Sequence, residues 1–512
     1  MPKKQGNSKK HKTTSLVFKL NNLPFLVLFT GFLGRLLVIY VVKENYWYDE
    51  IIVTQISTQS IKLLLDTIKA EPHPPGYYLL LKMITALDPI IVKLLTTTAS
   101  FLISLLALLY ARSKKIISHF NLSLGLAWFF ASFSFFSISK DVKHDSITFP
   151  VFLLFIFLIL CLIKEKKNFK AKEIVISHAL VLFMLFFGYI YYLQSLVILL
   201  IVSIYYTKKR LPKYLLIFQI VTLAVYIKLF AFDQIVINVG RFSWFGENYN
   251  SLLISITQHL TGITIANFWT DFQLILFFGS ITLVLFQKPK FVNLFLHNTL
   301  LLITILIIIV TYSVGLFSRV RYVSFLFLLL SVLAGWGIYS FKRKYKLLYY
   351  YFTALFIVYP LIHSYNAIRL SKIKNTTYSE EILASSDNNI GYLEDHPLAP
   401  YITKLSIKQH DKRLVPISIT NPELFKDKNA IDRSILALDG YYKNTTTDDL
   451  KKLFKKQNIN DYVYILKFQQ RQSYYDPKRL VLQTLNDSCK KDYIKPLSYD
   501  SILFVFKDCV FD

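Results

Sequence analysis

The sequence predicts a polytopic α-helical membrane protein with about eleven transmembrane helices and a small extracytoplasmic α/β domain at its C-terminal end. Composition is the first reason: 54% of the 512 residues are hydrophobic, and only 15 are Gly and 16 are Pro. The second reason is that apolar windows of roughly 20 residues, the length that crosses a bilayer, recur from Leu23 to about Ile362. A polar stretch of about 145 residues, 368–512, follows them and is called the tail below.

The apolar windows divide the chain into three regions. Residues 1–22 form a basic cytoplasmic N-terminus, residues 23–367 form the transmembrane domain, and residues 368–512 form the tail. The first window has no small-residue cleavage site, so we expect it to remain in the protein as a membrane helix. The predicted membrane helices cover residues 23–42, 91–110, 119–138, 147–163, 174–188, 191–206, 214–231, 272–286, 293–315, 322–341 and 347–363.

The distribution of Lys and Arg predicts the orientation of these helices. If the N-terminus is cytoplasmic, the inner loops hold about 23 basic residues, against about 9 in the outer loops of the same region. The formal net charge of +27 therefore reflects membrane topology rather than a nucleic-acid-binding surface. We expect a protein of the plasma (inner) membrane. The ER membrane is a less favoured alternative, based on glycosylation-type triplets that begin at Asn375, Asn444 and Asn486.

The first outer loop, residues 43–90, is long and contains a further apolar stretch. As a helix, this stretch, “GYYLLLKMITAL” from Gly76 to Leu87, would reach only about 18 Å, whereas the hydrocarbon core is about 30 Å thick. Counting it as a membrane helix would also move the basic residues 112–115 to the outer side. We therefore expect a re-entrant or amphipathic helix in the outer interface.

Polar residues gather in the predicted outer segments, as an interfacial active site requires. Each group also has a purely structural explanation. In this alternative explanation, Asp49 and Glu50 are a solvated pair at a helix end, and “EPHPPGYY” (71–78) is a turn stiffened by Pro. Arg319 and Arg321 are snorkelling side chains. The outer segments are residues 49–50, 71–78, 139–146, 188–195, 233 to about 269, and 318–322.

Three further residues carry charge near or within the membrane. Asp141 and Asp145 are four residues apart and share one face if their segment is helical, although a short charged loop is equally natural. Arg35 lies past the middle of the first predicted membrane helix, where an unpaired charge costs at least a few kcal/mol. Arg35 is therefore hard to explain as an incidental residue.

Four segments together resemble a known family. They are “YWYDE” (46–50), “EPHPPGYYLLL” (71–81), the acid-containing loop 139–146 and “SRVRYVSFLFLLLSVLAG” (318–335). This pattern is similar to the GT-C superfamily of membrane glycosyltransferases, and in particular to the protein O-mannosyltransferases and the lipid A aminoarabinose transferases. The resemblance covers about residues 20–365. It departs at Gly76, where the family usually has Leu, and in “KDVKHDS” (140–146), which is only loosely like the family's Arg-containing segments.

The resemblance implies an inverting hexosyl or pentosyl transferase. Such enzymes take a sugar from a polyprenyl phosphate carrier at the outer membrane face. The acceptor is a hydroxyl of a lipid-linked glycan, a cell-envelope polysaccharide or a protein. Asp49 would be the general base for this hydroxyl, and Glu50 beside it would raise its basicity. Asp141 and Asp145 are the second carboxylate candidates.

The phosphate of the donor needs fixed positive charge. Arg321 would bind the phosphate, with Arg319, Lys143 or Lys140 beside it, because guanidinium and ammonium groups stabilise a phosphate leaving group. The chain has no glycine-rich nucleotide-binding loop, which favours a lipid-linked donor over a nucleotide sugar.

A divalent cation is an open alternative at the acceptor site. Glu71 and His73 offer a carboxylate and an imidazole, which suit zinc or manganese, and magnesium is a further option. His144 is another candidate ligand. Without a metal, we expect His73 to hydrogen-bond within the acceptor site.

The tail predicts a small α/β domain. Its strand-like runs are “RLVPISI”, “DYVYILKF” and “SILFVFK”, and the helical run “TDDLKKLFKKQNI” starts at a Thr/Asp cap. Cys489 and Cys509 are both in the tail and are candidates for a disulfide in an oxidising compartment, whereas Cys161 lies within a predicted membrane helix. No catalytic group is evident in the tail, so we expect it to bind acceptor, to act as a lid or simply to add stability.

Two other protein classes remain as alternatives. A transporter of lipid-linked sugars would also place charges within a helical bundle, but it should show internal repeats or interrupted helices, which the sequence lacks. A polysaccharide ligase or polymerase would share the long outer loops. The pairing of “WYDE” with “HPP” favours sugar transfer of the GT-C type.

Overall fold

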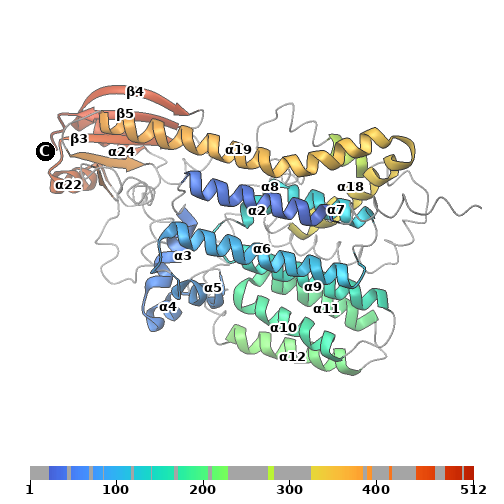
Figure 1. The fold of residues 1–512 in the computed structure, drawn as a ribbon. Helices are drawn as coiled ribbons and strands as arrows, with labels where there is room; N and C mark the ends of the chain where they lie inside the picture. The colour runs from blue at the N-terminus through green and yellow to red at the C-terminus, as the bar shows by residue number, and fades with distance from the viewer. Residues whose placement is uncertain are drawn as a thin grey trace, which may run out of the picture. The chain divides into compact units, whose positions relative to one another are not determined.

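The computed structural model describes residues 22–42, 48–68, 73–84, 86–116, 120–139, 141–165, 171–205, 210–228, 275–281, 324–384, 389–394, 414–417, 446–467, 479–498 and 501–511. Helices make up 79% of these residues, and the strands form a small sheet (Figure 1). The predicted mainly helical architecture is thereby confirmed. The chain divides into two compact units, residues 1–41 with 71–367 and residues 42–70 with 368–512.

The described part of the first unit, called the helical unit below, is built from helices. Its labelled elements are α2 (Leu23–Val42), α5 (Pro75–Lys82), α6 (Pro89–Ser113), α7 (Phe120–Ala131), α8 (Phe133–Ile138), α9 (Asp145–Glu165), α10 (Ala171–Phe187), α11 (Tyr189–Tyr205), α12 (Arg210–Tyr226), α18 (Ser324–Lys344) and α19 (Lys346–Ala384), whose last turns, from residue 368, belong to the second unit. Residues 275–281 are also helical.

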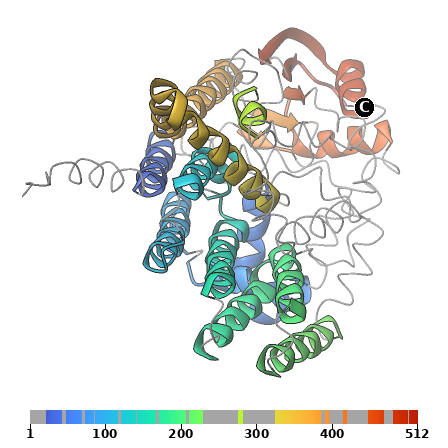
Figure 2. The same cartoon turned by 90° about the vertical axis from the view of Figure 1, so that its right-hand side faces the viewer.

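These helices pack side by side around an apolar core. α7 packs on α18 and α6 on α9, while α10 contacts α5, α9, α11 and α12. Figure 2 views several of them nearly along their axes. Aromatic rings fill the core: Trp128 of α7 lies 5.1 Å from the ring centroids of both Phe277 and Phe356. Gly125 permits the close approach of α7 to α18, because a Cβ there would overlap the backbone of Val332.

Two helices in the described part of the chain are long and apolar enough to cross a membrane, residues 23–41 of α2 and the whole of α6. Both lie where the sequence predicts membrane helices. Shorter apolar stretches of 10–17 residues lie in α7, α9, α11, α12 and α18. The predicted helix 293–315 lies outside the described residues, and 272–286 is described only over its helical part, 275–281.

The predicted helix 119–138 is wrong in one respect, because it is divided into α7 and α8 at Ser132. The Ser132 hydroxyl donates to the carbonyl of Phe129 at 2.7 Å and accepts from the backbone N–H of Phe135 at 3.3 Å. Ser132 is thus the N-cap of α8, and its extended backbone (φ −69°, ψ 150°) ends α7. A serine within an apolar run gives little sign of such a break, since Ser is also tolerated inside helices.

The second unit combines a mixed five-stranded sheet with helices. The sheet order is β2-β1-β3-β5-β4; β1 is parallel to β2 and β3, and β5 is antiparallel to β3 and β4. The elements are α3 (Tyr48–Thr58), α4 (Ile61–Ile68), β1 (Ile390–Glu394), β2 (Leu414–Pro416), α22 (Thr447–Gln457), β3 (Asp461–Lys467), α24 (Leu480–Ser488), β4 (Lys490–Ser498) and β5 (Ser501–Lys507). Residues 42–70, which the sequence assigns to the first outer loop, group with this unit.

The three strand-like runs and the helical run predicted for the tail correspond to β2, β3, β5 and α22. β1, β4 and α24 were not predicted. β4 is an edge strand whose sequence, KKDYIKPLS, contains three Lys and a Pro, and this composition protects an edge but hides the strand from an apolar pattern.

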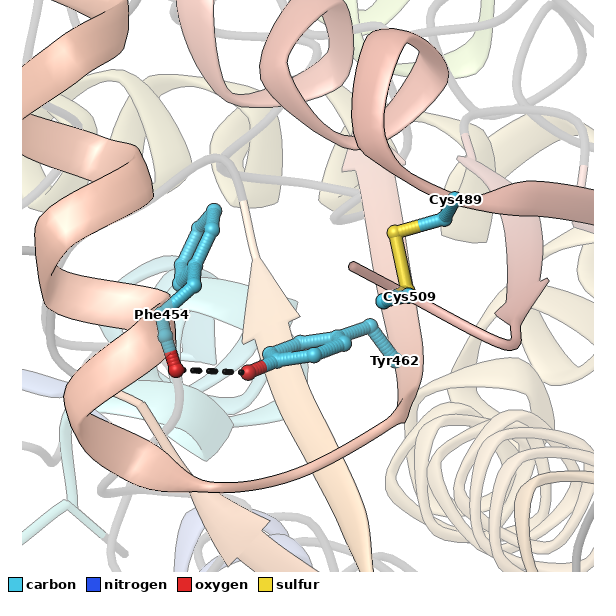
Figure 3. The surroundings of a disulfide bond; sticks show 4 residues. All are labelled: Phe454, Tyr462, Cys489 and Cys509. Carbon is cyan, nitrogen blue, oxygen red and sulfur yellow. Dashed lines mark hydrogen bonds between the residues drawn. A yellow bond between two sulfur atoms is a disulfide. The ribbon is translucent and has the colours of Figure 1, made fainter. Parts of the chain in front are cut away.

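Side chains of α22, β3 and β5 make the core of the second unit. Phe454 of α22 packs on Tyr462 of β3, whose hydroxyl donates to the Phe454 carbonyl at 3.3 Å (Figure 3). Burial raises the pKa of the Tyr462 hydroxyl, so this hydroxyl stays protonated and remains a donor. The structure contains the predicted disulfide between Cys489 and Cys509, which ties the end of α24 to the segment after β5.

Candidate functional site

Two predicted outer segments that are far apart in sequence meet in the helical unit. His73 precedes α5, and His144 precedes α9; their ring centroids are 4.2 Å apart. The Tyr77 ring meets the His144 ring edge-on at 6.4 Å. The local sequence explains the first position, because Pro74 is the extended N-cap of α5 and Pro75 occupies its first turn. The two prolines therefore fix where His73 enters the contact.

The segment before α9 is buried and polar. Residues Lys143, His144 and Asp145 are 5%, 5% and 2% exposed, and Asp141 is partly exposed. His144 Nε2 lies 3.2 Å from Asp145 Oδ1. Asp145 is the first residue of α9, where the exposed N–H groups and the helix dipole favour a carboxylate. The His144–Asp145 contact is thus held at a site that already favours negative charge.

Asp141 and Asp145 do not share a helix face. Asp141 lies in a bend whose carbonyl accepts from the backbone N–H of Lys143 at 2.8 Å, and the helix begins only at Asp145. Of the two alternatives left open by the sequence, the short charged loop is the one observed. Asp145 of this pair contacts His144.

The junction between α10 and α11 lies at the same end of the helical unit. A Cβ on Gly76 of α5 would lie 2.5 Å from the carbonyl oxygen of Phe186 and 2.9 Å from the ring of Phe187. A Cβ on Gly188 would lie 2.9 Å from Cγ2 of Thr148. α5, α9 and the α10–α11 junction therefore meet closely. We call this region, marked by His73, His144 and Phe186, the motif end.

The packing around α5 explains why position 76 is a glycine. α5 packs so closely on the end of α10 that no side chain fits at this position. Tyr77, Tyr78 and Leu81 of α5 are buried, whereas Leu79 and Leu80 are exposed. α5 has only eight residues and is too short to cross a bilayer; its place in a first outer loop stays a prediction.

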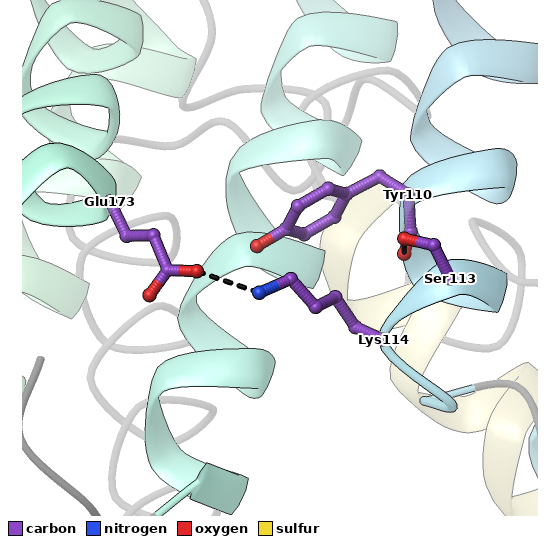
Figure 4. Close-up of polar contacts among 4 residues, drawn as sticks. All are labelled: Tyr110, Ser113, Lys114 and Glu173. Carbon is purple, nitrogen blue, oxygen red and sulfur yellow. Dashed lines mark hydrogen bonds and ion pairs between the residues drawn. The ribbon is translucent and has the colours of Figure 1, made fainter. Parts of the chain in front are cut away.

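Contacts at the opposite end join segments that the sequence assigns to the inner side. Lys114, just after α6, forms an ion pair of 2.7 Å with Glu173 in the first turn of α10 (Figure 4). Arg112 lies over the ring of Phe25, near the start of α2, at 5.6 Å. We call this region the basic end. The motif end and the basic end are thus opposite ends of α10, as the sequence predicts.

Asp49 and Glu50 belong to α3, in the second unit. The backbone of Asp49 is helical, and its side chain lies outside the described residues. Glu50 is 0% exposed, so the explanation of a solvated acidic pair is wrong for Glu50. The carbonyl of Glu50 accepts from the Thr54 hydroxyl at 2.8 Å, which is an ordinary contact between successive turns.

Several predicted site residues lie outside the described part of the chain, and their roles stay predictions. They are Glu71, Lys140, Arg319 and Arg321. Within the described residues, no group of three His, Cys, Asp or Glu side chains is arranged to hold a metal ion. His73 gains an imidazole neighbour in His144, while Glu71, its expected partner, is outside the described residues.

Sequence reasoning gave His144 a lesser role than the structure does. The two histidines are 71 positions apart, and nothing in the spacing indicates that their rings meet. For Tyr77, the sequence predicts only a place in an interface helix, and its contact with the His144 ring is not predicted. Neither a protein family model nor a curated protein matches the chain.

Proposed function

We propose that the chain is a multi-spanning membrane glycosyltransferase with about eleven transmembrane helices. It moves a sugar from a polyprenyl phosphate carrier to an acceptor hydroxyl on the outer membrane face, with inversion at the anomeric carbon. The observation that carries the proposal is the meeting of “EPHPPGYY” and “KDVKHDS” at the motif end, where His73, His144 and Asp145 lie together. Buried ionisable groups are costly and concentrate at functional sites.

The segregation of the two ends supports the membrane orientation in this proposal. Arg112 and Lys114 lie at the basic end, and the polar motif residues lie at the other. Positive charge collected at one end of a helical assembly fits the cytoplasmic face of a membrane. The motif end would then face outward, where lipid-linked sugars are presented.

In the proposed reaction, Asp49 accepts the proton of the acceptor hydroxyl as that oxygen attacks the anomeric carbon. The bond from this carbon to the phosphate oxygen breaks, its electron pair stays on the phosphate, and polyprenyl phosphate leaves. Glu50 keeps Asp49 basic through its like charge and its burial. Arg321, Arg319 and Lys143 stabilise the phosphate, and Lys143 is already held in a buried position.

The histidines position the acceptor in this scheme. His144 is oriented by Asp145, as an imidazole is commonly fixed by a carboxylate, and its ring supports that of His73. If a divalent cation takes part, His73, His144 and Glu71 are the residues of this chain suited to hold it.

The tail fits an extracytoplasmic location in this proposal. A disulfide between Cys489 and Cys509 is typical of an oxidising compartment. The acceptor is a lipid-linked glycan, a cell-envelope polysaccharide or a protein. The proposed location is the plasma (inner) membrane.

The test measures sugar transfer from a polyprenyl phosphate donor by the full chain in nanodiscs. Asp49→Asn should lower turnover by about 10²- to 10⁴-fold while donor binding persists, because Asn keeps the size but cannot take the proton. Glu50→Gln should have a milder effect. If Asp49→Asn keeps near-normal turnover while Asp145→Asn abolishes it, the base belongs to the segment before α9 and the assignment of Asp49 is wrong.

A second arm of the same assay tests the histidine contact. His144→Phe keeps a ring against His73 but removes both ring nitrogens, so transfer should fall by at least about tenfold with the melting temperature little changed. His178→Phe is the matched control, since His178 is a buried histidine within α10. Equal effects of the two variants on transfer would argue against a role for the motif end.

A further inference from the structure

Arg35 of α2 is enclosed by protein and lacks polar partners. Its side chain is 0% exposed. None of its three guanidinium nitrogens, Nε, Nη1 and Nη2, has a hydrogen-bond partner in the described part of the chain. A guanidinium carries five N–H donors and a fixed positive charge, and both normally demand compensation when they are buried. The native contacts of Arg35 leave that demand unmet.

The surroundings of Arg35 come from three helices. Its Cζ lies 4.9 Å from the ring centroid of Phe135 and 5.6 Å from that of Phe136, both in α8. These faces attract a cation but accept no conventional hydrogen bond. A Cβ on Gly31 would lie 3.3 Å from Nη2 of Arg35 and 3.7 Å from Cβ of Pro360 in α19, so the guanidinium lies beside the contact between α2 and α19.

The place of Arg35 along α2 is toward the motif end. Phe25, near the start of α2, lies at the basic end with Arg112. Arg35 is ten residues further on, about 15 Å along the helix axis. Its aromatic neighbours in α8 lie only a few residues before Lys143 and His144. A ligand group that reaches Arg35 would therefore approach from the side of the proposed site.

We propose that Arg35 is a binding residue for a phosphate-bearing anion within the helical unit. A phosphate supplies both the negative charge and the paired acceptor oxygens that match the guanidinium fork, and the described residues around Arg35 supply neither. Because Arg35 is 0% exposed, an anion can reach it only when neighbouring groups move; α8, which carries Phe135 and Phe136, has six residues. The identity of the lipid that would carry the phosphate rests on the proposed function. The binding of a phosphate by Arg35 does not.

The experiment measures anion binding by the full chain in phosphatidylcholine nanodiscs, through the shift in melting temperature and by titration. The probes are a polyprenyl phosphate, inorganic phosphate and phosphatidylglycerol. Arg35→Met keeps the side-chain length and removes the charge. It should weaken binding of the effective probe by about 10- to 100-fold. Arg112→Met is the matched control, because Arg112 also lies over a Phe ring but is exposed, and it should bind as the wild type does.

The melting temperature without ligand separates a binding role from a structural one. If Arg35 is kept for a ligand, Arg35→Met should be at least as stable as the wild type, because an uncompensated buried charge is removed. Reduced stability together with unchanged binding of all three probes would overturn the proposal. Arg35→Lys is the second variant in case Arg35→Met does not fold; its single ammonium should give intermediate affinity, and wild-type affinity would contradict recognition by the guanidinium fork.

The three probes distinguish the source of the phosphate. An effect of Arg35 on polyprenyl phosphate alone assigns a lipid-linked phosphate. An effect on inorganic phosphate assigns the free anion, and an effect on phosphatidylglycerol assigns a bilayer headgroup; each supports the proposal. Sugar transfer with an unchanged donor KM in Arg35→Met, together with unchanged binding of all three probes, would overturn the inference and leave the proposed function standing. Anion binding that depends on Arg35, without any sugar transfer, would support the inference and contradict the proposed function.

Discussion

Arg35 and Asp449 are charged residues in opposite surroundings. Arg35 is fully enclosed in the helical unit, and its guanidinium lies over the rings of Phe135 and Phe136. Burial of a charge without a counter-charge costs several kcal/mol, so its retention calls for an explanation outside the native contacts. Asp449 is exposed in α22, and its carboxylate accepts two hydrogen bonds from Thr446. Solvent access therefore separates the two residues: Asp449 is satisfied at the surface, whereas the buried charge of Arg35 has no counter-charge among the described residues.

Thr446 and Asp449 close the first turn of α22 with reciprocal hydrogen bonds. The Asp449 carboxylate accepts from the backbone N–H and the hydroxyl of Thr446, at 3.0 and 2.8 Å. The Thr446 hydroxyl accepts from the Asp449 N–H at 3.3 Å. This is a capping box, and it confirms the cap predicted from the sequence. The bonds from Thr446 hold the pKa of Asp449 below its usual value.

The lowered pKa of Asp449 predicts a pH dependence of stability. Because the folded state favours the ionised carboxylate, its contribution is present above the unfolded pKa of about 3.9 and is lost as the pH falls through the folded pKa. The wild type should exceed Asp449→Asn by up to about 1 kcal/mol at pH 6. The difference should vanish well below pH 4. Thermal unfolding of the two proteins across this range checks the prediction, and a constant difference would contradict it.

At the scale of elements, helix ends decide how the helical unit is arranged. α5 ends after two turns, α7 ends at the cap on Ser132, and α9 begins only at Asp145. These interruptions bring polar backbone and side chains to the motif end, which a set of uninterrupted membrane helices would not provide. The close approach of α5 to α10 at Gly76 fixes one part of that arrangement.

Gly76→Ala tests the contact between α5 and α10. In an open helix, Gly→Ala stabilises by up to about 1 kcal/mol. At Gly76 the new Cβ would meet the Phe186 carbonyl at 2.5 Å, so we expect a loss of about 1–3 kcal/mol and lower transfer activity.

Gly279→Ala is the matched control for this prediction. Gly279 is also helical, and a Cβ there would have no atom of the described residues within 4 Å. Thermal unfolding in detergent should show changes of opposite sign for the two variants. Stabilisation by both would mean that α5 is not held against α10.

At the scale of the whole molecule, the two ends of the helical unit differ in chemistry. The ion pair between Lys114 and Glu173 is partly exposed, with side chains 28% and 13% exposed, and it contributes little to stability. Its value here is geometric, because it links the end of α6 to the start of α10. An outward-facing motif end follows if the positive-inside bias holds.

Reporter fusions test this orientation. A reporter that is active only in an oxidising exterior should work when it is fused after Ile368 and fail when it is fused after Lys115, because these positions should lie on opposite sides of the membrane. The disulfide between Cys489 and Cys509 leads to the same expectation for the tail. The reverse pattern would overturn the orientation and, with it, the proposed outer site.

The sequence by itself determined the features that depend on local pattern. Apolar windows located the helices of the helical unit, and turn and cap chemistry located α5 and α22. The cysteine positions indicated the disulfide. These predictions succeed because periodicity, proline geometry and capping act within a few residues along the chain. The eleven membrane crossings and the sugar-transfer activity stay proposals.

The tertiary structure decided which distant segments meet. His73 touches His144 across 71 positions, Gly76 lies against Phe186, and Arg35 is enclosed without a polar partner in the described part of the chain. β1 and β4 join the sheet although their sequences give weak strand signals. In each case the outcome depends on packing between elements, and neighbours along the chain do not encode the burial or the contacts that this packing creates.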